Sequence, residues 1–111
     1  MTNKEIDTLI VNKLFGWDIK GYNSYRNPLV DKYGNGMEFP FSPSTNIENT
    51  WEVVNYLKDK VEFFNLDYED GLWNCEFGRE YSGENEVSDE KVELAICKAA
   101  LKAIDFKYWI N

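Results

Sequence analysis

Three segments with helical periodicity alternate along this chain with two segments whose turn residues predict β-hairpins. The resulting order, α-ββ-α-ββ-α, is the feature that most limits the fold. Short connections of this kind favour antiparallel pairing between neighbouring strands. The sequence therefore predicts one α+β domain over residues 1–111, with three helices packed on an antiparallel sheet of about four strands.

Each helical segment carries its own start signal. Thr2 and Glu5 have the spacing of a capping box before a helix over residues 3–14, and Thr45 and Glu48 repeat that spacing before the second helix. Ser88 can cap the third helix. The apolar stripe of the second helix consists of Ile47, Trp51, Val54, Leu57 and Val61. The stripe predicts that Trp51 is a core residue.

Turn residues mark the two hairpins. Asn35-Gly36 lies inside residues 21–39, and Asp70-Gly71 separates the β-rich runs 61–68 and 72–81. The first hairpin is the least regular part of the pattern, because it is long and rich in aromatic residues. The stretch that follows the second hairpin, residues 82–89, is polar and is predicted to be a loop.

Alternation on the last predicted strand sets its buried face. Trp73, Cys75 and Phe77 alternate with polar residues, so Cys75 is predicted to be a small buried side chain. We expect this face to pack against the apolar face of the third helix. The residues of that helix face are Val92, Ile96, Ala99 and Ala103.

Composition excludes several classes of function. Twenty acidic residues against twelve basic ones give a net charge of −8, which disfavours direct binding of nucleic acid or anionic membranes. The absence of histidine removes the usual catalytic triads and histidine metal sites. Two cysteines have no metal-ligand spacing, and no glycine-rich phosphate loop is present. We expect no cofactor, no metal and no enzymatic activity, and a cytoplasmic location.

Four segments resemble the markers of a known family. They are Leu14-Phe15-Gly16-Trp17, Pro40-Phe41-Ser42 through Trp51-Glu52-Val53-Val54, Trp73-Asn74-Cys75-Glu76-Phe77, and Ala95-Ile96-Cys97-Lys98-Ala99-Ala100-Leu101. In this order they resemble the phage ABA-sandwich domain family across nearly the whole chain. The resemblance implies a three-layer α/β/α sandwich and a phage or prophage context, and therefore the cytoplasm of a bacterial host cell. It transfers no catalytic residues.

Arginine beside tyrosine is the one pattern that suggests a ligand site. The chain has two arginines, and a guanidinium next to an aromatic ring can bind a phosphate and stack a base. The candidate ligand-binding residues are Arg26, Arg79, Tyr22, Tyr25 and Tyr81. Alternatively, both arginines lie on exposed strand faces and pair with nearby glutamates.

Two functions remain open on these observations. The first is a non-enzymatic counter-defence protein that sequesters a small anionic nucleotide immune signal. The second is an acidic inhibitor that mimics nucleic acid and occupies a basic cleft on a host enzyme.

The carboxylates of Asp67, Glu69 and Asp70 are expected to form a solvated hairpin tip rather than a metal site. An aromatic tail, residues 106–110, predicts a homo-oligomer.

Overall fold

The computed structural model describes residues 2–15, 18–21, 24–26, 38–78 and 85–106.

The first helix starts at the predicted capping box. In α1 (Asn3–Leu9), the Thr2 hydroxyl accepts a hydrogen bond from the Glu5 backbone N–H, and the Glu5 carboxylate accepts one from the Thr2 N–H, each at 3.1 Å. α1 continues directly as a π-helix, η1 (Ile10–Phe15). The predicted first helix is therefore confirmed.

The second helix, α3 (Ile47–Leu57), begins one residue later than predicted. Its N-cap is Asn46, whose side-chain oxygen accepts a hydrogen bond from the Asn49 backbone N–H at 3.1 Å. The predicted capping box of Thr45 and Glu48 is therefore wrong. Asparagine caps a helix start as well as threonine does, so the spacing alone did not distinguish the two neighbours.

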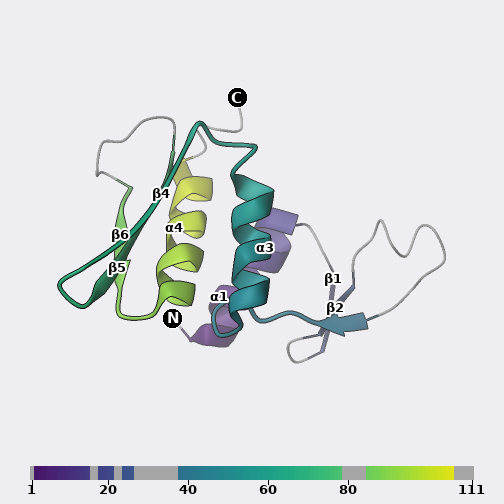
Figure 1. The fold of residues 1–111 in the computed structure, drawn as a ribbon. Coiled ribbons are helices and arrows are strands. Elements are labelled where there is room, and N and C mark those ends of the chain that lie inside the picture. The colour runs from purple at the N-terminus through teal and green to yellow at the C-terminus, as the bar shows by residue number, and fades with distance from the viewer. Residues whose placement is uncertain (1, 16–17, 22–23, 27–37, 79–84, 107–111) are drawn as a thin grey trace.

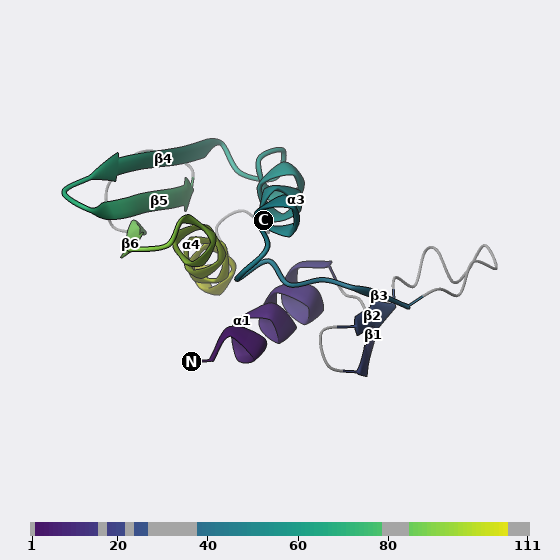
Figure 2. The ribbon, with the colours of Figure 1, turned by 60° about the horizontal axis from the view of Figure 1, so that its bottom comes forward.

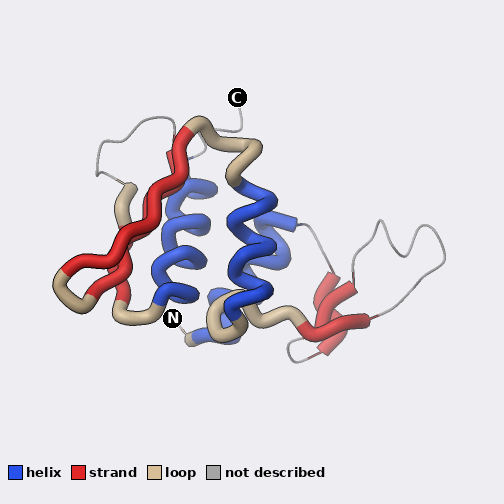
Figure 3. Tube along the Cα trace, viewed as in Figure 1, coloured by secondary structure: helices blue, strands red, loops and turns tan. Residues whose placement is uncertain are grey.

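The larger sheet contains three strands in the order β4–β5–β6. Figure 3 draws the described strands in red. β4 (Phe63–Glu69) and β5 (Leu72–Gly78) are antiparallel, and the predicted Asp70-Gly71 turn joins them. The φ angles of Asp70 and Gly71 are 54° and 81°, in the left-handed region that a two-residue hairpin turn requires. β6 (Val87–Asp89) pairs with the other side of β5, so the prediction of a loop is wrong for these residues.

A second three-stranded sheet consists of β1 (Asp18–Gly21), β2 (Ser24–Arg26) and β3 (Glu38–Pro40), which are antiparallel. The predicted Asn35-Gly36 turn lies outside the described residues. The α+β class is confirmed, whereas the single sheet of about four strands and its exact order are not. The described strands divide into two sheets, because the helices lie between them (Figure 1).

The core is centred on the last helix, α4 (Val92–Phe106), which packs on β5 and β6 and also contacts α1, η1 and α3 (Figure 2). Four of its fully buried residues are alanines, namely Ala95, Ala99, Ala100 and Ala103. Because an alanine side chain is a single methyl group, the helix backbone can approach its neighbours closely. Cys75 and Phe77 of β5 belong to the same buried cluster as Ile96, so the predicted packing of that strand on the third helix is confirmed.

Candidate functional site

Two of the five predicted ligand-binding residues lie in the described chain. Tyr25 and Arg26 occupy β2. The backbone register places Arg26 opposite Asp18 of β1 and Glu38 of β3, so its direct neighbours on both strands are acidic. Outside the described residues lie Tyr22, Arg79 and Tyr81.

The described backbone separates Arg26 from the end of β5. Gly78, the residue before Arg79, ends β5 in the larger sheet, whereas Arg26 ends β2 in the smaller one. β2 and β5 lie on opposite sides of the helices (Figures 1 and 2). The described backbone therefore does not bring Arg26 to the end of β5.

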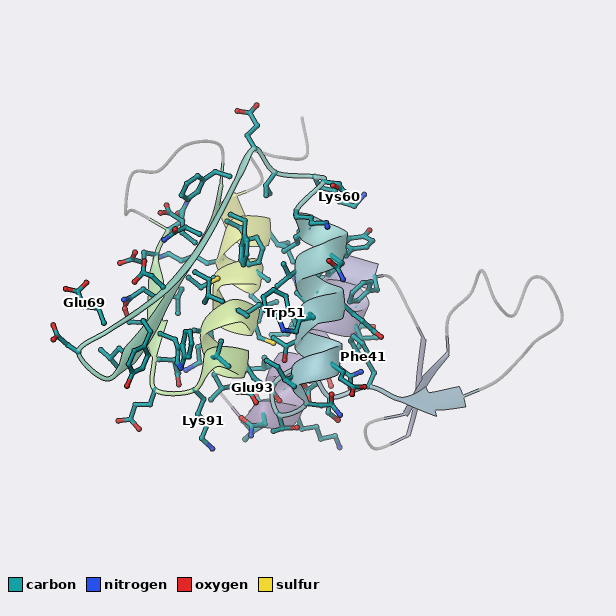
Figure 4. All side chains as sticks on the ribbon, viewed as in Figure 1. Phe41, Trp51, Lys60, Glu69, Lys91 and Glu93 are labelled. Carbon is teal, nitrogen blue, oxygen red and sulfur yellow. The ribbon has the colours of Figure 1, made fainter. Side chains whose placement is uncertain are left out.

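The α3 helix exposes two large apolar side chains that lie one helical turn apart. Ile47 is 40% exposed and Trp51 is 43% exposed. The prediction that Trp51 is a core residue is therefore wrong. Thr50 takes the neighbouring core position instead, because its hydroxyl donates a hydrogen bond to the Pro43 carbonyl at 2.7 Å and is satisfied while fully buried. Trp51 projects from the side of α3 that faces α4 (Figure 4).

Two exposed carboxylates lie beside these side chains. Glu48 and Glu52 are also one turn apart on α3, and like charges at this spacing destabilise a helix. Partial burial, followed by repulsion from Glu48, raises the pKa of Glu52. Ile47, Glu48, Trp51 and Glu52 together form what we call the α3 face, an apolar and acidic surface that a cationic partner would stabilise.

The tip of the β4–β5 hairpin is a second acidic surface. Tyr68 is 59% exposed and Leu72 is 38% exposed, with Glu69 and Asp70 exposed between them. The Tyr68 ring lies 5.0 Å from the Trp73 ring, centroid to centroid, so one of its faces is already partly covered. The predicted solvated tip is confirmed for these carboxylates.

A row of hydrogen bonds crosses the outer face of the larger sheet. Asp67 of β4 accepts hydrogen bonds from the side-chain amides of Asn65 and Asn74, each at 2.9 Å. Ser88 of β6 donates its hydroxyl to the Asn74 side-chain oxygen at 2.5 Å, and so does not serve as the predicted helix cap.

Within the described ranges, no group of three or more histidine, cysteine, aspartate or glutamate side chains is arranged to hold a metal ion.

Asp89 links β6 to the start of α4. Its carboxylate accepts a hydrogen bond from the Lys91 backbone N–H at 3.0 Å and forms an ion pair with Lys98 at 2.8 Å. Burial alone would raise the pKa of Asp89, but the hydrogen bonds from Lys98 and Lys91 outweigh burial and lower it. Asp89 is therefore a structural carboxylate that accepts hydrogen bonds at the start of α4.

Both thiols are unsuited to nucleophilic chemistry. Cys75 and Cys97 are free cysteines with no exposed surface. Burial, with a further contribution from the Glu76 carboxylate, raises the pKa of Cys75 to about 12. Burial likewise raises the pKa of Cys97, with a further contribution from Asp7. Because the thiolate is the reactive form, neither side chain is activated at neutral pH.

Asp7 is a buried carboxylate that connects two parts of the fold. It is 2% exposed and accepts a hydrogen bond from the Ser44 backbone N–H at 2.8 Å. Burial raises the pKa of Asp7, and the hydrogen bond from Ser44 offsets only part of that effect. The contact ties α1 to the segment that leads into α3, which is a structural role.

Comparisons with known proteins give one match. No curated protein and no solved structure matches the chain. None of the helices in the described ranges is long and apolar enough to cross a membrane. The profile of the phage ABA sandwich domain matches residues 8–101, which is most of the chain and includes every described helix and strand at least in part. The chain belongs to the phage ABA sandwich domain family.

Proposed function

We propose that this phage-family protein acts without catalysis, by binding a host protein through the α3 face. The observation that carries the proposal is the exposure of Trp51, 43%, next to Ile47 on the same helix. Tryptophan is among the residues most enriched in binding hot spots, and apolar anchors one turn apart are typical of a helix that lies in a partner's groove. The α3 face offers such anchors on a rigid, capped helix.

Charge indicates the kind of partner. The chain has a net charge of −8, and the Glu48 and Glu52 carboxylates repel each other on the α3 face. Lysine or arginine side chains on a partner would relieve this repulsion and speed association at low salt. The partner is therefore a host protein with a basic groove, which is the acidic-inhibitor alternative given a specific surface.

The chemistry of the described residues supports binding rather than catalysis. The pKa of Cys75 is raised, and the acids Asp7 and Asp89 hold the fold together through hydrogen bonds. The sequence contains no histidine to act as a base near neutral pH. A protein with these properties acts stoichiometrically, by occupying a surface.

The test begins with host proteins retained on the immobilised protein at low salt and released at high salt. The retained protein is identified, purified and titrated by calorimetry. Replacing Trp51 with alanine removes a central anchor and is expected to weaken binding by about 2 kcal/mol or more, roughly thirtyfold. The Glu48→Gln, Glu52→Gln double variant is expected to weaken binding and to flatten its dependence on salt.

Exposed side chains of similar accessibility provide a matched control. Ile47→Ala and Leu72→Ala each shorten a side chain that is about equally exposed, at 40% and 38%, but only Ile47 lies on the α3 face. We expect Ile47→Ala to weaken binding and Leu72→Ala to leave it unchanged. Equal effects of the two variants would contradict the proposed surface. Release of an intact nucleotide from the heat-denatured protein would instead support sequestration of a nucleotide signal.

A further inference from the structure

The first strand of the larger sheet has one unpaired edge in the described part of the chain. β4 pairs with β5 on one side, and no described strand pairs with its other side (Figure 2). It is a regular strand: all seven of its residues, Phe63–Glu69, pair with β5 without a register shift. Proline and lysine, which commonly protect an edge strand from pairing, are absent from it.

A second copy of the same chain could use this edge only in restricted registers. Two identical strands that pair antiparallel in a continuous sheet are related by a two-fold axis perpendicular to the sheet. The axis therefore passes between one residue and the same residue of the second copy, and this residue is the centre of the register. If the axis passes at Leu66, all seven residues of β4 pair with the seven residues of the second copy. Any other centre leaves part of the strand unpaired.

We infer that this protein forms a homodimer in which β4 pairs antiparallel with β4 of the second copy, centred on Leu66. In this register Asn65 lies opposite Asp67 of the second copy, so an amide donor faces a carboxylate twice across the interface. The Asn65 amide already donates to Asp67 of its own strand at 2.9 Å, which orients both groups on the outer face of the sheet. Opposed amide and carboxylate groups stabilise a cross-strand pair.

The residues on the opposite face of the strand from Asn65 and Asp67 also complement each other in the same register. Phe64 lies opposite Tyr68 of the second copy, which is an aromatic cross-strand pair, and Leu66 lies opposite its own copy. Tyr68 is 59% exposed, so a partner strand would bury one of the most exposed large side chains of the described chain. A register centred on Asp67 would instead place two carboxylates opposite each other. The strand is therefore self-complementary at Leu66, as a two-fold interface requires.

This interface is independent of the proposed function, because it uses β4 and not the α3 face. The test measures the mass of the full chain by sedimentation equilibrium over a range of concentration. The wild type is expected to reach twice the chain mass of 13.0 kDa. Asn65→Asp places carboxylates opposite each other twice in the dimer, and is expected to raise the dimer dissociation constant by about tenfold or more.

Two further variants separate the interface from a loss of folding. The exchange variant Asn65→Asp, Asp67→Asn restores an amide opposite a carboxylate, and is expected to restore the dimer. Ser88→Asp adds the same charge to the outer face on β6, away from the β4 edge, and is expected to leave the dimer intact. Amide exchange provides a direct readout, since β4 amides should exchange more slowly in concentrated than in dilute wild-type protein.

Three outcomes would overturn the inference. They are a wild type that stays monomeric into the high micromolar range, a dimer that Asn65→Asp leaves unchanged, and an exchange variant that is folded but does not dimerise. Removal of residues 107–111 distinguishes the β4 interface from association through the aromatic tail. Loss of the dimer on that truncation, with Asn65→Asp without effect, would assign the association to the aromatic tail.

Discussion

Replacement of Asp7 tests how much one buried contact contributes to the fold. Asp7 is 2% exposed and accepts the backbone N–H of Ser44 at 2.8 Å. Asp7→Ala leaves that buried N–H without its acceptor, which costs about 1–3 kcal/mol of unfolding free energy. For a domain of this size, each kcal/mol lowers the melting temperature by roughly 4 °C. Asp7→Asn keeps an acceptor oxygen at the same place, and should stay within about 1 kcal/mol of the wild type at neutral pH.

The pH dependence of the same variants follows from the raised pKa of Asp7. Because the folded pKa lies above the unfolded value of 3.8, the folded state binds the Asp7 proton more readily than the unfolded state does. The contribution of Asp7 to stability therefore rises as the pH falls through the folded pKa, and levels off below the unfolded one. Asp7→Asn removes this contribution. As the pH falls through that window, the wild type should therefore gain unfolding free energy relative to Asp7→Asn.

Urea denaturation at several pH values, followed by circular dichroism, measures these differences. Wild type, Asp7→Asn and Asp7→Ala are compared at equal protein concentration, so that any self-association affects all three alike. The reasoning fails if Asp7→Ala is as stable as Asp7→Asn at neutral pH. It also fails if the stability difference between wild type and Asp7→Asn does not change with pH, because the Asp7 carboxyl would then titrate alike in both states.

Three further changes test individual elements by chemical denaturation. Cys75→Asp places a carboxylate at a position with no exposed surface and should cost several kcal/mol, so an unchanged unfolding midpoint would show that the strand faces another way. Asn46→Ala removes the cap of α3 and should cost about 0.5–2 kcal/mol, while Asn46→Ser should restore most of it. Gly71→Ala forces an alanine to a φ of 81° and should cost about 1 kcal/mol, and no loss would mean that the turn differs.

Local signals with a defined geometry were the ones that predicted the fold. The Thr2 and Glu5 capping box is present with both of its hydrogen bonds, and Asp70-Gly71 forms the expected turn. Each of these depends only on residues a few positions apart. β6 was missed because Val87–Asp89 is too short to show alternation within a polar stretch. Its pairing with β5 depends on a contact between distant parts of the sequence.

Side-chain burial on α3 was harder to predict than the helix itself. The apolar stripe assigned Trp51 to the core, but the buried face includes Thr50, whose hydroxyl reaches the Pro43 carbonyl. Periodicity ranks residues by hydrophobicity and cannot register a hydrogen bond that makes a polar residue suitable for burial. The exposed Trp51, and with it the α3 face, could not be found from the pattern. The predicted ligand residues Tyr25 and Arg26 are placed in β2, and their role stays a prediction.

The alanines of α4 have a consequence for the entropy of folding. Ala95, Ala99, Ala100 and Ala103 have no exposed surface, and alanine has no side-chain rotamers to lose when it is buried. A leucine at each position would lose about 0.5–1 kcal/mol of rotamer freedom on burial. At these four positions the entropic penalty of ordering the contact therefore falls almost entirely on the backbone. Heat, which amplifies every entropic penalty, should weaken the α4 contacts less than it weakens those made by longer side chains.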